Sequence, residues 1–192
     1  MMENAVRSER TRQAAIQAAL AIIARDGPGR LTLDAIARES GISKGGLMHQ
    51  FRTKQAVLKA LLEHQIEHFE KFSQDYLAST DPRQPEAHLS AQIETLREAV
   101  SEPHSVAFAI VAALAEEPDL LSIIRDIDVQ KIANIKAEAA DPELAMLRWA
   151  AARGLVLSSV FGLCPFSAEE RERLFARLLD ARQWDAFAKA NR

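Results

Sequence analysis

Glycine and proline occur in a few clusters that divide this chain into long segments of strong helix formers. The main clusters are Gly27–Gly29 and Thr80–Pro85, and single prolines mark further breaks at positions 103, 118, 142 and 165. The intervening segments are rich in Ala, Leu, Glu, Arg and Gln, with apolar residues three and four positions apart and no strand-like alternation. The pattern predicts an all-α fold of about nine helices.

The first 53 residues predict three helices. A helix over Arg10–Arg25 should end near Asp26, because Gly27–Gly29 combines residues able to adopt a positive φ with a helix breaker. A short helix should follow over Leu33–Ser40, and another should run from Ser43 toward Phe51.

The residues that flank these two short helices predict their caps. Thr32 and Ser43 can each accept a hydrogen bond from a backbone N–H in the first helical turn. Gly41 lies between the helices and permits the positive φ that a tight turn requires. Thr53 is expected to cap a much longer helix that runs to about Leu77.

Two short helices joined by a tight turn can read DNA when the second packs on the first and leaves its outer face exposed. The small residue Ala37 marks the expected crossing, and the expected core anchors are Ile36, Ile42, Leu47 and Phe51. The outward residues are then Ser43, Lys44, Gly46, Met48, His49 and Gln50. Glycine is a poor helix former, so Gly45 and Gly46 predict a close approach of the backbone to DNA.

Charge is distributed unevenly along the chain. Residues 1–59 hold ten Lys and Arg against five Asp and Glu, whereas residues 60–192 hold fourteen against twenty-two. The first segment therefore has a net charge of +5 and the second −8. Because attraction to phosphate depends on local charge, only the first segment is expected to meet a nucleic acid.

The remaining length predicts a larger helical domain. We expect a helix-turn-helix domain over residues 1–53, a helix from 53 that bridges the two parts, and a body over residues 54–192. The run from 106 to 115 is apolar on nearly every helical face, which a packed core and a ligand cavity explain equally well. No apolar stretch approaches the ~18 residues of a membrane span, and the single cysteine fits a reducing compartment, so a cytoplasmic protein is expected.

The segment Thr32–Leu47, with His49, Phe51 and Thr53–Leu58, resembles the DNA-binding domain of the TetR (tetracycline repressor) family. The resemblance is specific over about residues 10–62 and architectural beyond them. It implies a three-helix head on a helical ligand-binding body, two-fold dimerisation through the last two helices, and release of operator DNA when an effector binds the body.

The resemblance also assigns roles to residues of this chain. It implies phosphate contacts by Thr32 and Lys54, and an aromatic residue, usually Tyr, is common in the family where this chain has Met48. Met48 offers neither a hydroxyl nor a stacking face, whereas the amide of Gln50 could read adenine or be solvated. The implied DNA-binding residues are Thr32, Leu33, Ser43, Lys44, Gly45, Gly46, Met48, His49 and Lys54.

The body is expected to bind an unidentified hydrophobic or amphipathic small molecule and to form a homodimer. The residues predicted to line the effector pocket are Ile93, Leu96, Phe108, Trp149, Arg153 and Phe161. Small residues beside large ones on the last two helices, expected over about 142–163 and 167–188, favour close packing between subunits. The predicted interface residues are Ala151, Leu155, Ser158, Ser159, Leu174 and Leu178.

Two other functions remain open. A DNA-binding dimer without a ligand would have the same head and a body with no cavity. His64, Glu67 and His68 fit the H-x-x-E-H motif of zinc hydrolases, in which two histidines on one helix face bind the metal. That motif falls on the bridging helix, no third ligand is evident, and we expect no metal, no cofactor and no enzyme activity.

Overall fold

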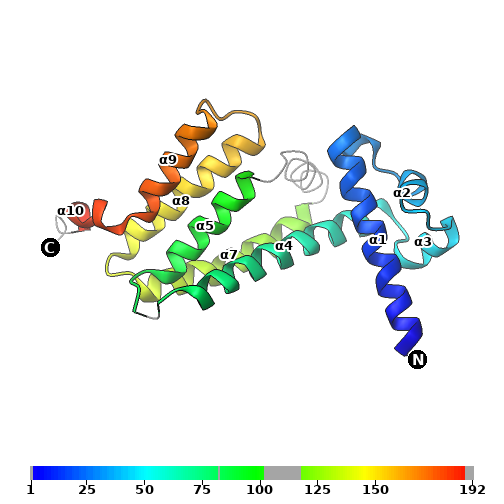
Figure 1. Ribbon diagram of the computed structural model, residues 1–192, viewed down its shortest axis with the longest axis horizontal. Coiled ribbons are helices and arrows are strands. Elements are labelled where there is room, and N and C mark those ends of the chain that lie inside the picture. Colours follow the sequence, from blue (N-terminus) through cyan, green and yellow to red (C-terminus); the bar gives the residue numbers. More distant parts are fainter. Residues whose placement is uncertain (1, 82, 102–117, 189–192) are drawn as a thin grey trace. The chain divides into compact units, whose positions relative to one another are not determined.

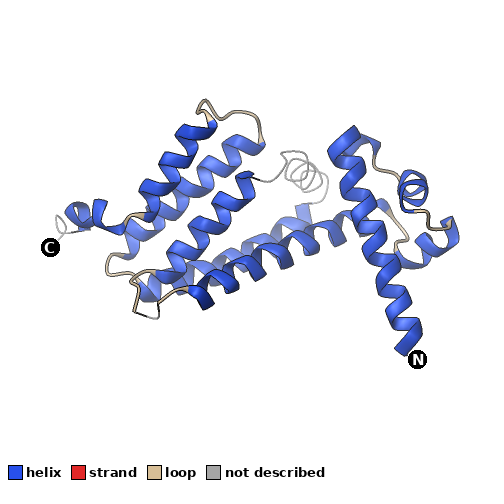
Figure 2. Cartoon of the chain, in the orientation of Figure 1, coloured by secondary structure: helices blue, strands red, loops and turns tan. Residues whose placement is uncertain are grey.

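The computed structural model describes residues 2–81, 83–101 and 118–188. Within these ranges it contains nine α-helices, two short 3₁₀ turns and no strand, as Figure 2 shows, which confirms the all-α prediction. No helix in these ranges combines the length and the hydrophobicity that a membrane span requires. The chain forms two compact units: a head, described over residues 2–67 and 118–121, and a body, described over 68–101 and 122–188.

The head holds three complete helices and the first part of a fourth. These are α1 (Met2–Asp26), α2 (Leu33–Ser40), α3 (Lys44–Gln50) and α4 (Lys54–Ser79), with a 3₁₀ turn, η1 (Pro28–Arg30), after α1 (Figure 1). α1 ends where the sequence predicts, because Gly27 adopts a φ of 83° and its N–H donates to the carbonyl of Ile23 at 3.0 Å. It begins at Met2 rather than at Arg10.

The predicted caps of the head are present. Gly41 ends α2 with a φ of 69°, in the left-handed region that favours glycine. Each of the three predicted hydroxyls accepts a hydrogen bond from a backbone N–H three residues later. The bonds join Thr32 to Ala35 at 3.1 Å, Ser43 to Gly46 at 3.2 Å, and Thr53 to Ala56 at 3.1 Å.

An apolar core joins the helices of the head. Ile36 of α2, Leu47 of α3 and Phe51 after α3 are buried as predicted, and Ile42 packs against them at the edge. The guanidinium group of Arg12 lies over the ring of Phe51, 5.5 Å from its centroid. α1 contacts both α2 and α3, so the short helices are held on a common support.

The body consists of the second part of α4 and five further helices. They are α5 (Ala87–Ser101), α7 (Pro118–Glu138), α8 (Pro142–Val160), α9 (Ala168–Leu179) and α10 (Asp185–Ala188), with the 3₁₀ turn η2 (Ala181–Gln183) before α10. Of these, α7 belongs to the body from residue 122 onward. α5 packs against α8 and α9 (Figure 1). Asp141 caps α8 by accepting from the N–H of Leu144, and Ser167 and Glu170 form a reciprocal capping box on α9.

A buried arginine ties the body together. Arg148 of α8 is only 2% exposed, and its Nε and Nη2 donate to the carbonyl oxygen of Leu178 at 2.9 and 2.7 Å. Its Nη1 lies 2.5 Å from a carboxylate oxygen of Glu86, just before α5. Its guanidinium group also lies over the ring of Trp184, 5.9 Å from the centroid. Arg148 therefore links α5, α8, α9 and the C-terminal segment.

The last long helix is shorter than the sequence predicts. We expected it to run to about residue 188, whereas α9 ends at Leu179 and the chain turns through η2 into the short α10. The carbonyl of Leu178 bonds to Arg148, and the carbonyl of Arg177 accepts from the indole N–H of Trp184 at 2.9 Å. Side chains thus take the carbonyls that a continuing helix would have used, and the helix stops.

Candidate functional site

α3 exposes the face that the sequence predicts. Its inward residue Leu47 is fully buried, whereas the next residue, Met48, is 45% exposed. The predicted outward residues of this segment are all exposed, except Gly46 and Gln50, which are half-buried. The capped α2 and the buried side of α3 hold this face at a fixed angle, which is the arrangement that reading a DNA groove requires.

The two glycines of α3 differ in their surroundings. A Cβ on Gly46 would lie 3.1 Å from the Ser43 hydroxyl and 3.3 Å from a methyl group of Ile42, so the N-cap itself leaves little room there. A Cβ on Gly45 would meet no atom within 4 Å. Close packing inside the head therefore accounts for Gly46, whereas no contact within the head accounts for Gly45, and the approach of its backbone to DNA stays a prediction.

Thr32 and Ser43 retain hydrogen-bonding capacity beyond their capping roles. Each hydroxyl oxygen accepts one backbone N–H, and a hydroxyl that accepts can still donate its own proton. Both residues are exposed, so both can donate to a phosphate oxygen. Leu33 is half-buried and packs against the head core, and Lys54 is half-buried at the start of α4.

Lys44 has an acidic neighbour that the sequence reading missed. Its ammonium group lies 2.9 Å from the carboxylate of Asp34 on α2, and both side chains are about two-thirds exposed, at 66% and 69%. The hydrogen bond from Lys44, followed by its positive charge, lowers the pKa of Asp34 below its usual value. Asp34 is therefore ionised at neutral pH and competes with any phosphate for Lys44.

Gln50 makes an internal contact that the sequence did not predict. Its amide Nε2 donates to the hydroxyl of Ser8 on α1 at 2.7 Å, and its side chain is half-buried. The bond spans 42 residues of sequence, so no local pattern could reveal it. It joins the C-terminal end of α3 to the N-terminal part of α1.

Two of the predicted effector residues lie together in the body. The guanidinium group of Arg153 lies over the ring of Trp149, 5.1 Å from the centroid, and forms an ion pair with Asp128 of α7. All three side chains are partly buried. Stacked and paired in this way, they provide an aromatic face and charges of both signs.

The other predicted effector residues are dispersed. Ile93 is a fully buried core residue of α5, and Leu96 packs against the same core. Phe161 is 49% exposed at the C-terminal end of α8, about 18 Å from Trp149 along the helix axis at ~1.5 Å per residue. Phe108 and the apolar run around it lie outside the described residues.

The interior of the body is more polar than the sequence indicated. Ser73 of α4 and Gln92 of α5 are both buried, and the Gln92 amide donates to the Ser73 hydroxyl at 3.0 Å. Thr95 is also buried, and its hydroxyl donates to the carbonyl of Ala91 at 2.7 Å. These polar residues lie among apolar neighbours, and hydrophobic periodicity alone does not predict that they are buried.

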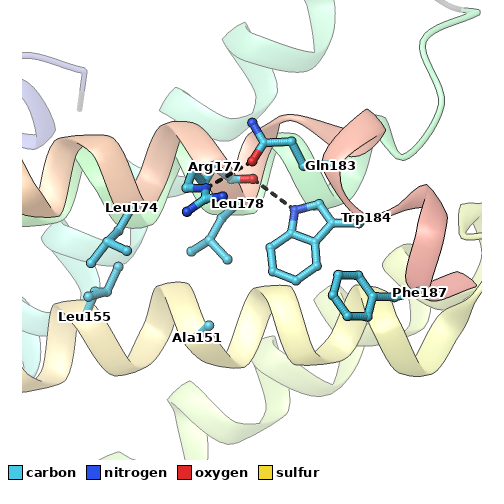
Figure 3. A pocket seen from close by; sticks show the side chains of 8 residues that line it. All are labelled: Ala151, Leu155, Leu174, Arg177, Leu178, Gln183, Trp184 and Phe187. Carbon is cyan, nitrogen blue, oxygen red and sulfur yellow. Dashed lines mark hydrogen bonds between the residues drawn. The ribbon is translucent and has the colours of Figure 1, made fainter.

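Four of the predicted dimer residues line one half-open groove between α8 and α9. The groove has a volume of about 440 Å³, and Figure 3 shows Ala151 and Leu155 of α8 opposite α9, with Trp184 and Phe187 at one end. Its lining residues are Ala151, Leu155, Leu174, Arg177, Leu178, Gln183, Trp184 and Phe187. The sequence did not single out the last two aromatic residues, because it predicted one long helix there.

The remaining predicted dimer residues face inward to different degrees. Ser159 is buried and Ser158 is half-buried, and both hydroxyls donate to the carbonyl of Leu155, at 2.8 and 3.0 Å. Leu178 also belongs to the body core. Elsewhere on α8, Leu147 and Leu157 are 67% and 43% exposed, so both leave apolar surface open on this helix.

The zinc-hydrolase motif lies on α4. His64 is half-buried, and Glu67 and His68 are exposed. The ring of His68 makes an edge contact with Phe69, with centroids 5.2 Å apart. Within the part of the chain that the structure describes, no three His, Cys, Asp or Glu side chains are grouped so as to hold a metal ion.

Comparison with known proteins identifies both units. Residues 15–61 match the family model described as "Bacterial regulatory proteins, tetR family", and residues 86–182 match "Tetracyclin repressor-like, C-terminal domain". The HTH-type transcriptional regulator BetI of Yersinia pestis (strain Pestoides F) is 31% identical over 83 residues, which are 43% of this chain and 42% of BetI. The match thus spans less than half the length of that relative.

Solved structures share the fold over nearly the whole chain. A transcriptional regulator from Rhodococcus sp. Rha1 has a TM-score of 0.69 and 19% identity, and the match covers 91% of this chain and 96% of that one. The multidrug binding protein EbrR, solved in complex with malachite green, has a TM-score of 0.63 and 22% identity, with 87% and 96% covered. At sequence identities this low, the structural similarity establishes only that this chain shares their fold.

Proposed function

This chain belongs to the TetR family of bacterial regulatory proteins, and from that membership we propose that it is a DNA-binding transcription regulator controlled by a small molecule. The observation that carries the proposal is α3, whose inner side is buried by Leu47 and whose outer side is exposed around Lys44 and Met48. A DNA-binding protein acts on the chromosome, so we place it in the cytoplasm.

In this proposal the head reads DNA through a positioned helix and a set of phosphate contacts. The hydroxyls of Thr32 and Ser43 donate to phosphate oxygens while they cap their helices. Lys44 exchanges the carboxylate of Asp34 for a phosphate or a guanine edge, and His49 faces the groove. Met48 adds an apolar contact where the family commonly has an aromatic residue.

The body binds the effector in this proposal. Trp149, Arg153 and Asp128 offer an aromatic face beside paired charges, which suits an amphipathic molecule better than a purely apolar one. The buried pair of Gln92 and Ser73 adds polar groups that a ligand can use. The complex of EbrR with malachite green supports a small-molecule effector for this fold.

We infer that two copies pair through α8 and α9. The groove beside Ala151 and Leu155 is open, and Leu147 and Leu157 leave apolar surface exposed on α8. A second copy that covers this face would remove that surface from water. Two heads then bind a pseudo-palindromic operator whose half-sites are about 34 Å or more apart.

Regulation follows as a population shift. An effector that binds better to a conformer with the wrong head spacing lowers the affinity for the operator, and α4 carries residues of both units. A coupling free energy of about 1–3 kcal/mol corresponds to a 5- to 150-fold loss of DNA affinity. The protein thus acts as a repressor that its effector releases.

The test is binding of the purified protein to the DNA that flanks its own gene, measured by fluorescence anisotropy at two salt concentrations. We expect tight, salt-dependent binding that Lys44→Ala weakens at least about tenfold, since it removes a contact to phosphate or base. Lys71→Ala is the matched control, because Lys71 is an exposed lysine of the body. Equal binding by Lys44→Ala and Lys71→Ala would contradict the assignment of α3.

A further inference from the structure

We propose that the N-terminal part of α1, residues 6–13, is a second DNA-contacting element of the head. In it, Arg7 and Arg10 bind phosphates of the DNA backbone beside the groove that α3 occupies. The proposal rests on the proposed function, since it adds contacts to the same DNA-binding event. It concerns affinity rather than sequence recognition, because phosphate contacts carry no direct sequence information.

The first observation is that α1 extends well beyond the core that it supports. The first buried residue of the described part of α1 is Ala15, and every residue from Val6 to Ala14 is exposed or half-buried. Figure 1 shows these N-terminal turns continuing past α3. These turns therefore add no buried apolar side chain to the core of the head.

The second observation is that this segment is fixed against α3. Gln50, at the end of α3, donates to Ser8 at 2.7 Å, and Arg12 lies over Phe51 and bonds to Glu63 at 3.2 Å. These contacts come from one side of α1, because Ser8 and Arg12 are four residues apart. They fix the position of this segment relative to α3.

The third observation is that Arg7 and Arg10 are exposed and, among the described side chains, unpaired. Arg7 and Arg10 are three residues apart and share a flank of α1, and both are exposed. Among the residues whose side chains the structure describes, neither guanidinium group has a hydrogen-bond or ion-pair partner. The other flank carries Glu9 and Gln13, which bond to each other at 3.0 Å. Lys44, by contrast, is paired with Asp34.

Charge complementarity indicates that the partner bound by Arg7 and Arg10 is DNA. Two unpaired cations lie on a helix that is bonded to the end of α3, in the segment of the chain that has a net positive charge. Arginine binds phosphate through two N–H groups at once, and its charge persists at any physiological pH. The bond from Gln50 to Ser8 keeps this part of α1 close to α3, so the backbone of a duplex bound by α3 is the polyanion nearest to the two arginines.

The test is the salt dependence of binding to a random-sequence DNA duplex, which needs no knowledge of the operator. Each phosphate contact contributes about 0.9 to the slope of log K against log salt. The variant Arg7→Ala/Arg10→Ala should lower that slope by about 1.8 for each bound head and weaken binding about 30-fold per head at ~0.15 M salt. Arg7→Lys/Arg10→Lys should retain most of the slope.

A matched control removes two exposed cations from the body, Lys71→Ala/Arg125→Ala, and should leave the slope unchanged. Circular dichroism shows whether each variant keeps its helices. An unchanged slope in the Arg7/Arg10 variant, with the wild-type protein still binding, would overturn this inference and leave the proposed function intact. Failure of the wild-type protein to bind any duplex would overturn both.

Discussion

The head and the body are both helical, but they bury different kinds of side chain. Among the described residues, every buried side chain of the head is apolar. The body buries six polar or charged ones: Ser73, Ser90, Gln92, Thr95, Arg148 and Ser159. In the head, polar side chains are exposed or at most half-buried, whereas in the body six of them are part of the interior.

This difference corresponds to the two tasks that we propose. An apolar core with well-capped short helices gives a rigid unit that presents one face. A core with bonded polar groups depends on partners that lie far apart in sequence, such as Arg148 and Glu86, which are 62 residues apart. Such groups specify one arrangement strongly, and a ligand that offers better partners can favour another.

The largest effect is expected at the buried ion pair of the body. Glu86→Ala leaves the charge of Arg148 buried and without its carboxylate, so the free energy of unfolding should fall by about 3–5 kcal/mol in urea denaturation. Asp81→Ala removes the partner of Arg83, which is 90% exposed, and should cost about 0–1 kcal/mol. Equal costs for the two variants would show that the interior pair stabilises the fold no more than the surface pair does.

The apolar core of the head should respond more locally. Leu47→Ala opens a cavity at a fully buried position and should cost about 3 kcal/mol, whereas Met48→Ala, at an exposed position, should cost less than about 0.5 kcal/mol. Hydrogen exchange should show the loss of protection in α1 to α3 and not in α8 and α9. Equal loss in both units would mean that they unfold as one.

The smallest effect is expected at the surface of the head. Asp34→Asn removes the carboxylate that pairs with Lys44, and affinity for DNA should rise about 2- to 5-fold, in proportion to one charge. Because Lys44 lowers the pKa of Asp34, the carboxylate stays charged as pH falls toward its ordinary pKa. The ratio of the DNA affinities of the variant and the wild type should therefore be constant from about pH 6 to about pH 8. A decrease in affinity would instead mean that Asp34 positions Lys44 for DNA.

The features that the sequence predicted are those set by neighbouring residues. The caps at Thr32, Ser43 and Thr53 act over three residues, and the turn at Gly41 depends on one backbone angle. Periodicity likewise predicted which side of α3 is buried, because Leu47 and Phe51 repeat at helical spacing. These signals are complete within a short window of sequence.

The features that it missed depend on the tertiary arrangement. The N-terminal part of α1 lacks an apolar pattern because its contacts are polar, through Ser8 and Arg12, so the helix was expected to begin later. The early end of α9 depends on Arg148, which is 30 residues from Leu178 in sequence. Which groups meet around Arg153 in the body likewise follows from packing rather than from any local pattern.

Selection of bound sequences from a random DNA pool tests the central claim most directly. The claim is that α3 reads a base sequence and that two copies bind together. We predict enrichment of an inverted repeat whose half-sites are one helical turn or more apart, about 34 Å or above. Recovery of unenriched sequences, or of single half-sites without a repeat, would contradict the claim.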